Sequence, residues 1–145
     1  PQIVTDNYGY FWVSWLDERN TDTEGLDLFV QKFEIGGDKE WNSTGTLIGS
    51  GLKEFGEYSM VLNKGGYLLL AWTEEGADDS TQKSRIHMQK VRPGGEKVIG
   101  ESSTVVKSSD QKQYAPAIAI SKGGEICLIF AERGRKTGIF AVPLR

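Results

Sequence analysis

A unit that occurs three times constrains the fold of this chain more than any other feature of its sequence. Three segments align in one register, namely residues 1–19, 58–76 and 116–134. Each holds a glycine six residues before an aromatic residue, in the pairs Gly9–Trp15, Gly66–Trp72 and Gly124–Phe130. The glycines are 57 and then 58 residues apart. A repeat of this length indicates supersecondary units that stack and bury their apolar faces against their neighbours.

Each full unit contains four predicted strands, the first two of which make up the aligned segments. Further on, "DLFVQKFEIGG" (27–37) aligns with "RIHMQKVRPGG" (85–95), and "TGTLIGS" (44–50) aligns with "SSTVVKS" (102–108). The third unit continues only to "GIFAVPLR" (138–145), so it lacks the fourth strand. Helix is an alternative for "DDSTQKSRIHMQKV" (78–91), but its alignment with the strand-like "LDLFVQKF" favours a strand.

The connections between the first and second strands of each unit predict tight turns. "TDNYG", "LNKGG" and "ISKGG" place an aspartate, asparagine or serine shortly before a glycine. Such side chains bond to the backbone of the turn, and the glycine accepts a positive φ. The 18 glycines and the short apolar runs between them are typical of an all-β chain.

The second strand of the middle unit is apolar at nearly every position, as "YLLLAW" (67–72) shows. A sheet with one solvated face would alternate apolar and polar residues. Four-stranded sheets that stack around an axis cover each central strand on both faces, as β-propeller blades do. We therefore predict a β-propeller segment with blades at 1–57, 58–115 and 116–145, the third lacking its outermost strand. A two-sheet sandwich is the alternative, but it does not explain a four-strand unit repeated in register.

Short motifs in the first unit resemble the repeats of sialidase-like and related β-propellers. The motifs are Pro-x-Ile-x-x-Asp-x-x-Gly at residues 1–9, Trp-x-Asp-x-Arg at residues 15–19, and "FVQK" at residues 29–32. They mark a blade rather than an activity. The later copies replace Asp17 with Glu74 and Glu132, and no copy carries the strict Asp-box of that family.

Three blades are too few to close a ring, since propellers use four to eight. We therefore expect the ring to be completed by the rest of a longer chain or by homo-oligomerisation, and we favour the longer chain.

Several function classes are disfavoured by composition. The net charge is −3 and no basic block exceeds three residues, which disfavours a nucleic-acid partner. No apolar run is long enough for a membrane span. The single cysteine, Cys127, excludes an intrachain disulfide and is expected to be a small buried residue. Our expectation for the compartment is a secreted or cell-surface protein.

No catalytic, metal or cofactor site is predicted from the residues. The sole histidine, His87, aligns with Phe29 and Phe140 and is expected in the core or between strands. The resemblance implies that a sialidase-type site would need an arginine triad, but only Arg19 and Arg133 lie at similar blade positions, near the end of the second strand. An ion pair with Asp17 is the expected role of Arg19, and Trp41 is expected to pack at a blade edge. The acidic loops match no EF-hand pattern.

We therefore expect a non-catalytic module that binds a protein or a glycan, and no enzyme. A segment of a sialidase-like glycoside-processing propeller is the alternative. The loops between strands two and three, and those between blades, share one end of a propeller by the resemblance, and here they hold the longer and more varied sequences. The predicted partner-binding residues on these loops are Arg19, Phe55, Glu74, Glu75, Tyr114, Arg133 and Arg135. Loops that act only as solvated connectors are the other interpretation.

Overall fold

The computed structural model describes residues 1–19, 25–52, 57–75, 84–99, 104–106, 110–134 and 138–144. These residues form strands and turns and contain no helix. The strands are β1 (Gln2–Thr5), β2 (Tyr10–Asp17), β3 (Leu26–Glu34), β4 (Thr46–Leu52), β5 (Tyr58–Leu62), β6 (Leu68–Glu75), β7 (Ser84–Val91), β8 (Thr104–Val105), β9 (Lys112–Ile120), β10 (Ile126–Arg133) and β11 (Gly138–Leu144). The predicted all-β fold is confirmed.

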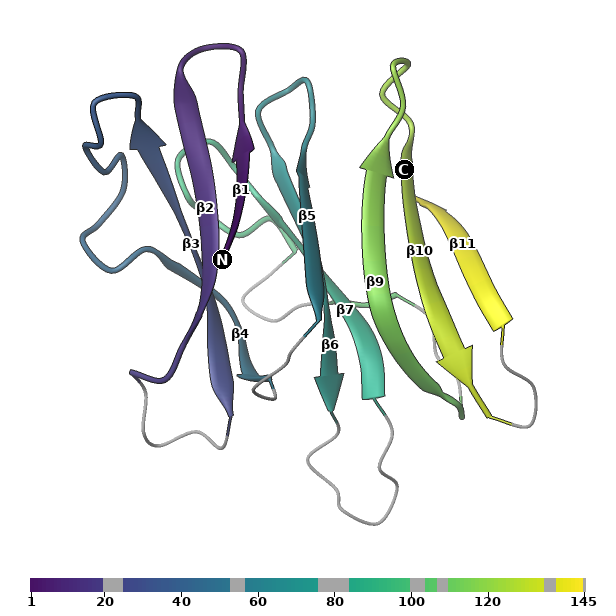
Figure 1. The fold of residues 1–145 in the computed structure, drawn as a ribbon. Coiled ribbons are helices and arrows are strands. Elements are labelled where there is room, and N and C mark those ends of the chain that lie inside the picture. Colours follow the sequence, from purple (N-terminus) through teal and green to yellow (C-terminus); the bar gives the residue numbers. More distant parts are fainter. Residues whose placement is uncertain are drawn as a thin grey trace.

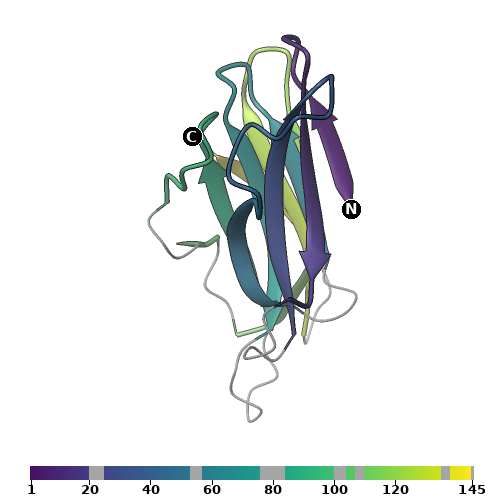
Figure 2. The same cartoon turned by 90° about the vertical axis from the view of Figure 1, so that its left-hand side faces the viewer.

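The strands form three antiparallel sheets, which we call blades 1, 2 and 3. Their strand orders are β1-β2-β3-β4, β5-β6-β7-β8 and β9-β10-β11. Figure 1 shows the blades next to one another, and Figure 2 shows them one behind the other with blade 1 in front. Blade 3 has three strands in the described part of the chain. The architecture is the predicted β-propeller segment. Strand β9 begins at Lys112, ahead of the start expected at residue 116.

Each blade has a turn end and a loop end. At the turn end (top of Figure 1) short hairpins join β1 to β2, β5 to β6 and β9 to β10. The second strand of each blade (β2, β6 and β10) ends at the loop end. Its last residue pairs there with a residue near the start of a neighbouring strand. The three pairs are Asp17↔Asp27 (β2 and β3), Glu75↔Ser84 (β6 and β7) and Arg133↔Lys112 (β10 and β9). The antiparallel register therefore places the longer connections together at one end.

The three hairpins at the turn end are built alike. The Oδ1 atom of Asp6 accepts hydrogen bonds from the backbone amides of Tyr8 (2.8 Å) and Tyr10 (3.0 Å). Asn63 Oδ1 and Ser121 Oγ accept the corresponding pairs of amides in the other two turns. The glycine at the end of each turn has a φ between 75° and 94°, which residues with a Cβ rarely adopt. The predicted turn chemistry is confirmed.

A glutamine in the third strand of blades 1 and 2 holds the chain that leads to the fourth strand. Gln31 Nε2 donates to the Asn42 carbonyl (2.6 Å), and its Oε1 accepts from the Trp41 amide (3.3 Å). Gln89 makes the same two bonds to the amide and the carbonyl of Ile99, at 3.0 and 3.3 Å. Both glutamines are buried, so the repeated "QK" pair has a structural cause.

Each side of the central strand β6 packs against a different blade. Leu68, Leu70 and Trp72 are fully buried in a cluster with residues of blade 1, including Trp12, Leu28 and Val30. On the opposite face, Ala71 packs with Leu128 and Phe130 of blade 3. This explains why the sequence of β6 does not alternate. In blade 3, Cys127 is only half-buried because it lies on the face opposite Leu128, so the expectation of a buried cysteine is wrong.

Candidate functional site

Four of the seven predicted binding residues are described with their side chains, and all four lie at the loop end. Arg19 follows β2, Glu74 lies in the last part of β6, Tyr114 lies near the start of β9, and Arg133 ends β10. Glu75 ends β6, with only its backbone described. Phe55 and Arg135 lie outside the described residues.

These four residues do not form one cluster, because they belong to different faces of the blades. Arg19 lies on the face of blade 1 that points away from blade 2, with Trp15 and Phe29. Glu74 lies on the side of blade 2 that faces blade 1, next to Trp72. Blade 2 therefore lies between Arg19, which follows β2 of blade 1, and Arg133, which ends β10 of blade 3.

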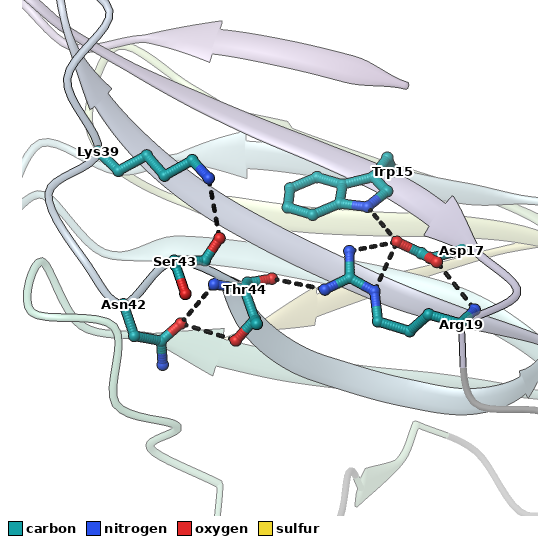
Figure 3. A network of polar contacts seen from close by, with 7 residues as sticks. All are labelled: Trp15, Asp17, Arg19, Lys39, Asn42, Ser43 and Thr44. Carbon is teal, nitrogen blue, oxygen red and sulfur yellow. Dashed lines mark hydrogen bonds and ion pairs between the residues drawn. The ribbon is translucent and has the colours of Figure 1, made fainter.

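Arg19 is fixed by an aspartate two residues earlier (Figure 3). Its Nε donates to Asp17 Oδ2 (2.8 Å), a second guanidinium nitrogen contacts the same oxygen, and its backbone amide donates to Asp17 Oδ1 (2.9 Å). Trp15 Nε1 also donates to Asp17 Oδ2 (2.9 Å). The hydrogen bonds from Arg19 and then from Trp15 hold the pKa of Asp17 well below its usual range. The expected Arg19–Asp17 ion pair is confirmed.

The guanidinium of Arg19 lies over an aromatic ring and borders a shallow hollow. Its central carbon is 4.4 Å from the centre of the Phe29 ring, and its Nη1 donates to the Thr44 carbonyl (3.3 Å). On the far side, Lys39 Nζ donates to the Ser43 carbonyl (2.8 Å). The hollow has a volume of about 290 Å³ and is lined by Val13, Trp15, Arg19, Gln31, Phe33, Lys39, Ser43 and Thr44. Aromatic, cationic and hydroxyl groups of this kind suit either a polar ligand or another protein surface.

His87 lies between blades 1 and 2 with Glu74 and Trp72. Its Nδ1 is 3.6 Å from Glu74 Oε2, and its ring is 5.9 Å from the Trp72 ring. Burial lowers the pKa of His87, and the positive charge of Arg85 lowers it further, whereas Glu74 opposes both. Burial thus favours the neutral imidazole, which packs beside the Trp72 ring. The expectation of a core or inter-strand role is confirmed.

A bulge in the first strand of blade 3 is a feature that the sequence did not reveal. The pairing of β9 with β10 slips between Ala117↔Ile129 and Tyr114↔Ala131. At the slip, Ala115 has a φ of 54° although it precedes Pro116, a context that favours extended backbone. The carboxylate of Glu57, the residue just before β5, accepts the Ala115 amide. No local signal marks this position, because the strain depends on a residue 58 positions earlier.

The bulge changes which residues of β9 face blade 2. Gln113 is fully buried, and its Oε1 accepts the Ile86 amide of blade 2 (3.1 Å). Its Nε2 donates to Glu132 Oε1 (3.4 Å), and its carbonyl accepts the Ser84 hydroxyl (2.6 Å). Because neighbouring residues in a strand point to opposite faces, Tyr114 points away from blade 2. There it lies diagonally from Arg133, which is exposed opposite Lys112.

The described residues show neither a metal-binding cluster nor a membrane-spanning helix. No three His, Cys, Asp or Glu side chains come together there in a group that would hold a metal ion. Those residues also contain no helix with the length and apolar character of a membrane span. Trp41 donates from Nε1 to the Pro93 carbonyl of blade 2 (3.0 Å) and packs edge-on against Trp12, so the expected packing role is confirmed.

One solved structure resembles this chain. The sequence itself matches no protein-family model and no curated protein. The similar structure is an endo-arabinase from Bacteroides thetaiotaomicron, with a TM-score of 0.58 and 12% sequence identity. The match covers 99% of this chain and 55% of the endo-arabinase chain, so this chain spans about half of that protein. The likeness supports a β-propeller-like fold.

Proposed function

We propose that this chain is part of a non-catalytic β-propeller module that binds a protein or a glycan at its loop end. The observation that carries the proposal is the bulge at Ala115, which turns Tyr114 outward beside Arg133. Bulges and strained residues occur often where a strand must aim a side chain for function. A tyrosine gives rigid contact area and an arginine gives directional hydrogen bonds, and both types dominate binding energies at interfaces.

The contrast between the two ends supports the choice of the loop end. At the turn end, the side chains of Asp6, Asn63 and Ser121 bond to the amides of their own turns. At the loop end, Arg133 and Lys112 are exposed and Tyr114 is half-buried on the same face of blade 3. Glu74 keeps 35% of its side chain exposed at the junction of blades 1 and 2. Charged and aromatic groups are therefore presented to a partner from more than one blade.

The hydrogen bonds to Asp17 disfavour a general-acid role for its carboxyl group. A carboxyl group that donates a proton near neutral pH needs a raised pKa. The bonds from Arg19 and Trp15 lower the pKa of Asp17 instead. The Arg19–Asp17 pair therefore acts as a fixed polar support rather than as an acid–base pair.

A glycan is the first ligand class to test. The endo-arabinase is named for its action on an arabinose polymer, and its fold resembles this chain. A polysaccharide of arabinose is therefore a reasonable first probe, together with an array of other glycans. A protein partner would be sought next by the same measurements.

The test is calorimetric titration of the chain with the arabinose polysaccharide and with each glycan that the array identifies. We expect Tyr114→Ala and Arg133→Ala each to weaken binding by about 1 kcal/mol or more, which is roughly fivefold. Lys122→Ala is the matched control, because Lys122 is exposed at the turn end. Binding that survives both loop-end changes and is lost with Lys64→Ala or Lys122→Ala would place the site at the turn end and overturn the proposal.

The alternative function is a segment of a sialidase-like glycoside-processing propeller. The resemblance of the motifs around Arg19, and the enzyme named above, support it. It is tested with fluorogenic sialosides and arabinosides. Turnover that is lost in Arg19→Ala would favour this alternative over a non-catalytic module.

A further inference from the structure

The face of blade 1 that points away from blade 2, which we call the outer face, repeats a face that is buried in blade 2. Equivalent positions of the repeat are apolar in both blades. In blade 2 these positions are buried, with relative exposures of 7% for Met60 and 0% for Leu70 and Trp72. On the outer face, the equivalent Ile3 is 61% exposed and Trp15 is half-buried. The same kind of surface is thus covered in one blade and open in the other.

The contacts between blades 1 and 2 show what covers such a face. Trp72 lies against Gly49 in β4, the outermost strand of blade 1, and a Cβ at Gly49 would be 2.8 Å from the indole. Trp41, which precedes β4, lies against Gly95 and donates to the Pro93 carbonyl (3.0 Å).

Two polar side chains complete the junction between these blades. Thr46 Oγ1 donates to the Gly95 carbonyl (3.0 Å). From the innermost strand of blade 1, Gln2 Nε2 donates to the Tyr58 carbonyl (2.6 Å). The junction thus uses both the innermost and the outermost strand of the covering blade.

We propose that the outer face of blade 1 receives a further complete blade of the same repeat, supplied from outside residues 1–145. Its outermost strand would carry a glycine opposite Trp15, as Gly49 lies opposite Trp72. The hollow beside Trp15 and Arg19 would then be part of a blade junction. Its aromatic lining agrees with this role, because the centres of the Trp15 and Phe29 rings are 5.9 Å apart, the same distance as between the Trp72 and His87 rings in blade 2.

A second copy of this chain would cover the outer face of blade 1 less well than a further blade. Its free face would be that of blade 3, whose described residues form three strands without an outermost one. Among the described residues of that blade, none occupies the positions that correspond to Gly49, Thr46 or Trp41. The described part of that face exposes Ala117, Ala119 and Ile129, so it offers apolar surface but not the outer half of the junction.

The experiment adds a second copy of residues 1–57 directly before Pro1, because this length reproduces the spacing of the repeat. Trp15→Ala is then introduced into the original blade 1 of both the extended and the unextended chain. We expect Trp15→Ala to lower the Tm of the extended chain by about 4 °C more than that of the unextended chain. Replacing the added blade's glycine that corresponds to Gly49 with leucine should abolish this difference. Trp15→Phe, a smaller change, gives a second comparison if the alanine variants do not fold.

Equal effects of the Trp15 substitutions in both chains would overturn the proposal. Sedimentation of the unextended chain tests whether a second copy of the chain, rather than a further blade, covers the outer face. A dimer that Trp15→Ala dissociates would show that a second copy covers the outer face, and this too would overturn the proposal. The outcome is independent of ligand binding at Tyr114 and Arg133, so failure here leaves the proposed function untouched.

Discussion

The indole of Trp72 lies directly on the backbone of Gly49, across the junction between blades 1 and 2. A Cβ at Gly49 would approach three ring atoms to 2.8–2.9 Å. Trp72 is fully buried, so the ring has no open side to move into. The absence of a side chain at residue 49 is therefore what allows the two sheets to approach this closely.

Gly49→Ala should destabilise the protein. The new methyl group has to displace a buried indole, and such overpacking typically costs about 1–3 kcal/mol. We expect a loss of that size in the free energy of unfolding, measured by urea denaturation. Gly36→Ala is the matched control, because a Cβ there meets nothing within 4 Å. Equal stability of the two variants would show that Trp72 does not depend on Gly49.

Gln31→Ala should also lower stability, for a different reason. The side-chain amide of Gln31 hydrogen-bonds to the backbone N–H of Trp41 and to the backbone carbonyl of Asn42. Removing a buried hydrogen-bond partner typically lowers the free energy of unfolding by about 1–3 kcal/mol. Gln89→Ala should behave alike, since it makes the same bonds to Ile99. Glu34→Ala, an exposed change in the same strand as Gln31, is the control in urea denaturation. A loss no greater than that of the control would contradict the role given to the glutamines.

His87→Phe should reduce the dependence of stability on pH. Burial lowers the pKa of His87 in the folded protein, so the unfolded chain binds more protons below about pH 6.5. The neutral imidazole therefore contributes to the stability of the fold above that pH, and this contribution is lost as the pH falls. Phenylalanine occupies the equivalent positions 29 and 140 and does not titrate.

The measurement is thermal unfolding at pH 7.5 and pH 5.5. The wild-type Tm should fall more between these values than that of His87→Phe. His87 is the only histidine of the chain, which makes the difference specific. Parallel curves for the two proteins would mean that the imidazole titrates alike in the folded and unfolded states.

Asp17→Asn should destabilise the protein more at neutral pH than in strong acid. Arg19 and Trp15 lower the pKa of Asp17 in the folded protein. The ionised carboxylate therefore stabilises the fold above the pKa of about 4 that it has in the unfolded chain, and this stabilisation is lost as the pH falls further. Thermal unfolding at pH 7 and at pH 2 checks this, with the exposed Asp38→Asn as control. A Tm difference from wild type that persists undiminished at pH 2 would contradict the pairing.

The location of the candidate site was only partly predictable. The end of the molecule that holds Arg19, Glu74, Tyr114 and Arg133 was expected from the resemblance to propellers, and the antiparallel order of the strands agrees with it. The face on which each residue lies did not follow. The bulge at Ala115 reverses the alternation of β9, and this turns Tyr114 outward and buries Gln113. A slip of one residue exchanges the faces of a strand, and nothing in the local sequence announces it.

The sequence by itself determined the three blades, their strands and their turns. These features depend on local chemistry: the spacing of Gly9, Gly66 and Gly124, the side chains that bond within their own turns, and the apolar run of β6. The tertiary structure alone decided which residues meet across the blades, such as Glu57 with Ala115 and Trp72 with Gly49. Such contacts join residues far apart in the chain, and they are set by how two twisted sheets stack. That arrangement depends on all the side chains of the junction together, and no short stretch of sequence encodes it.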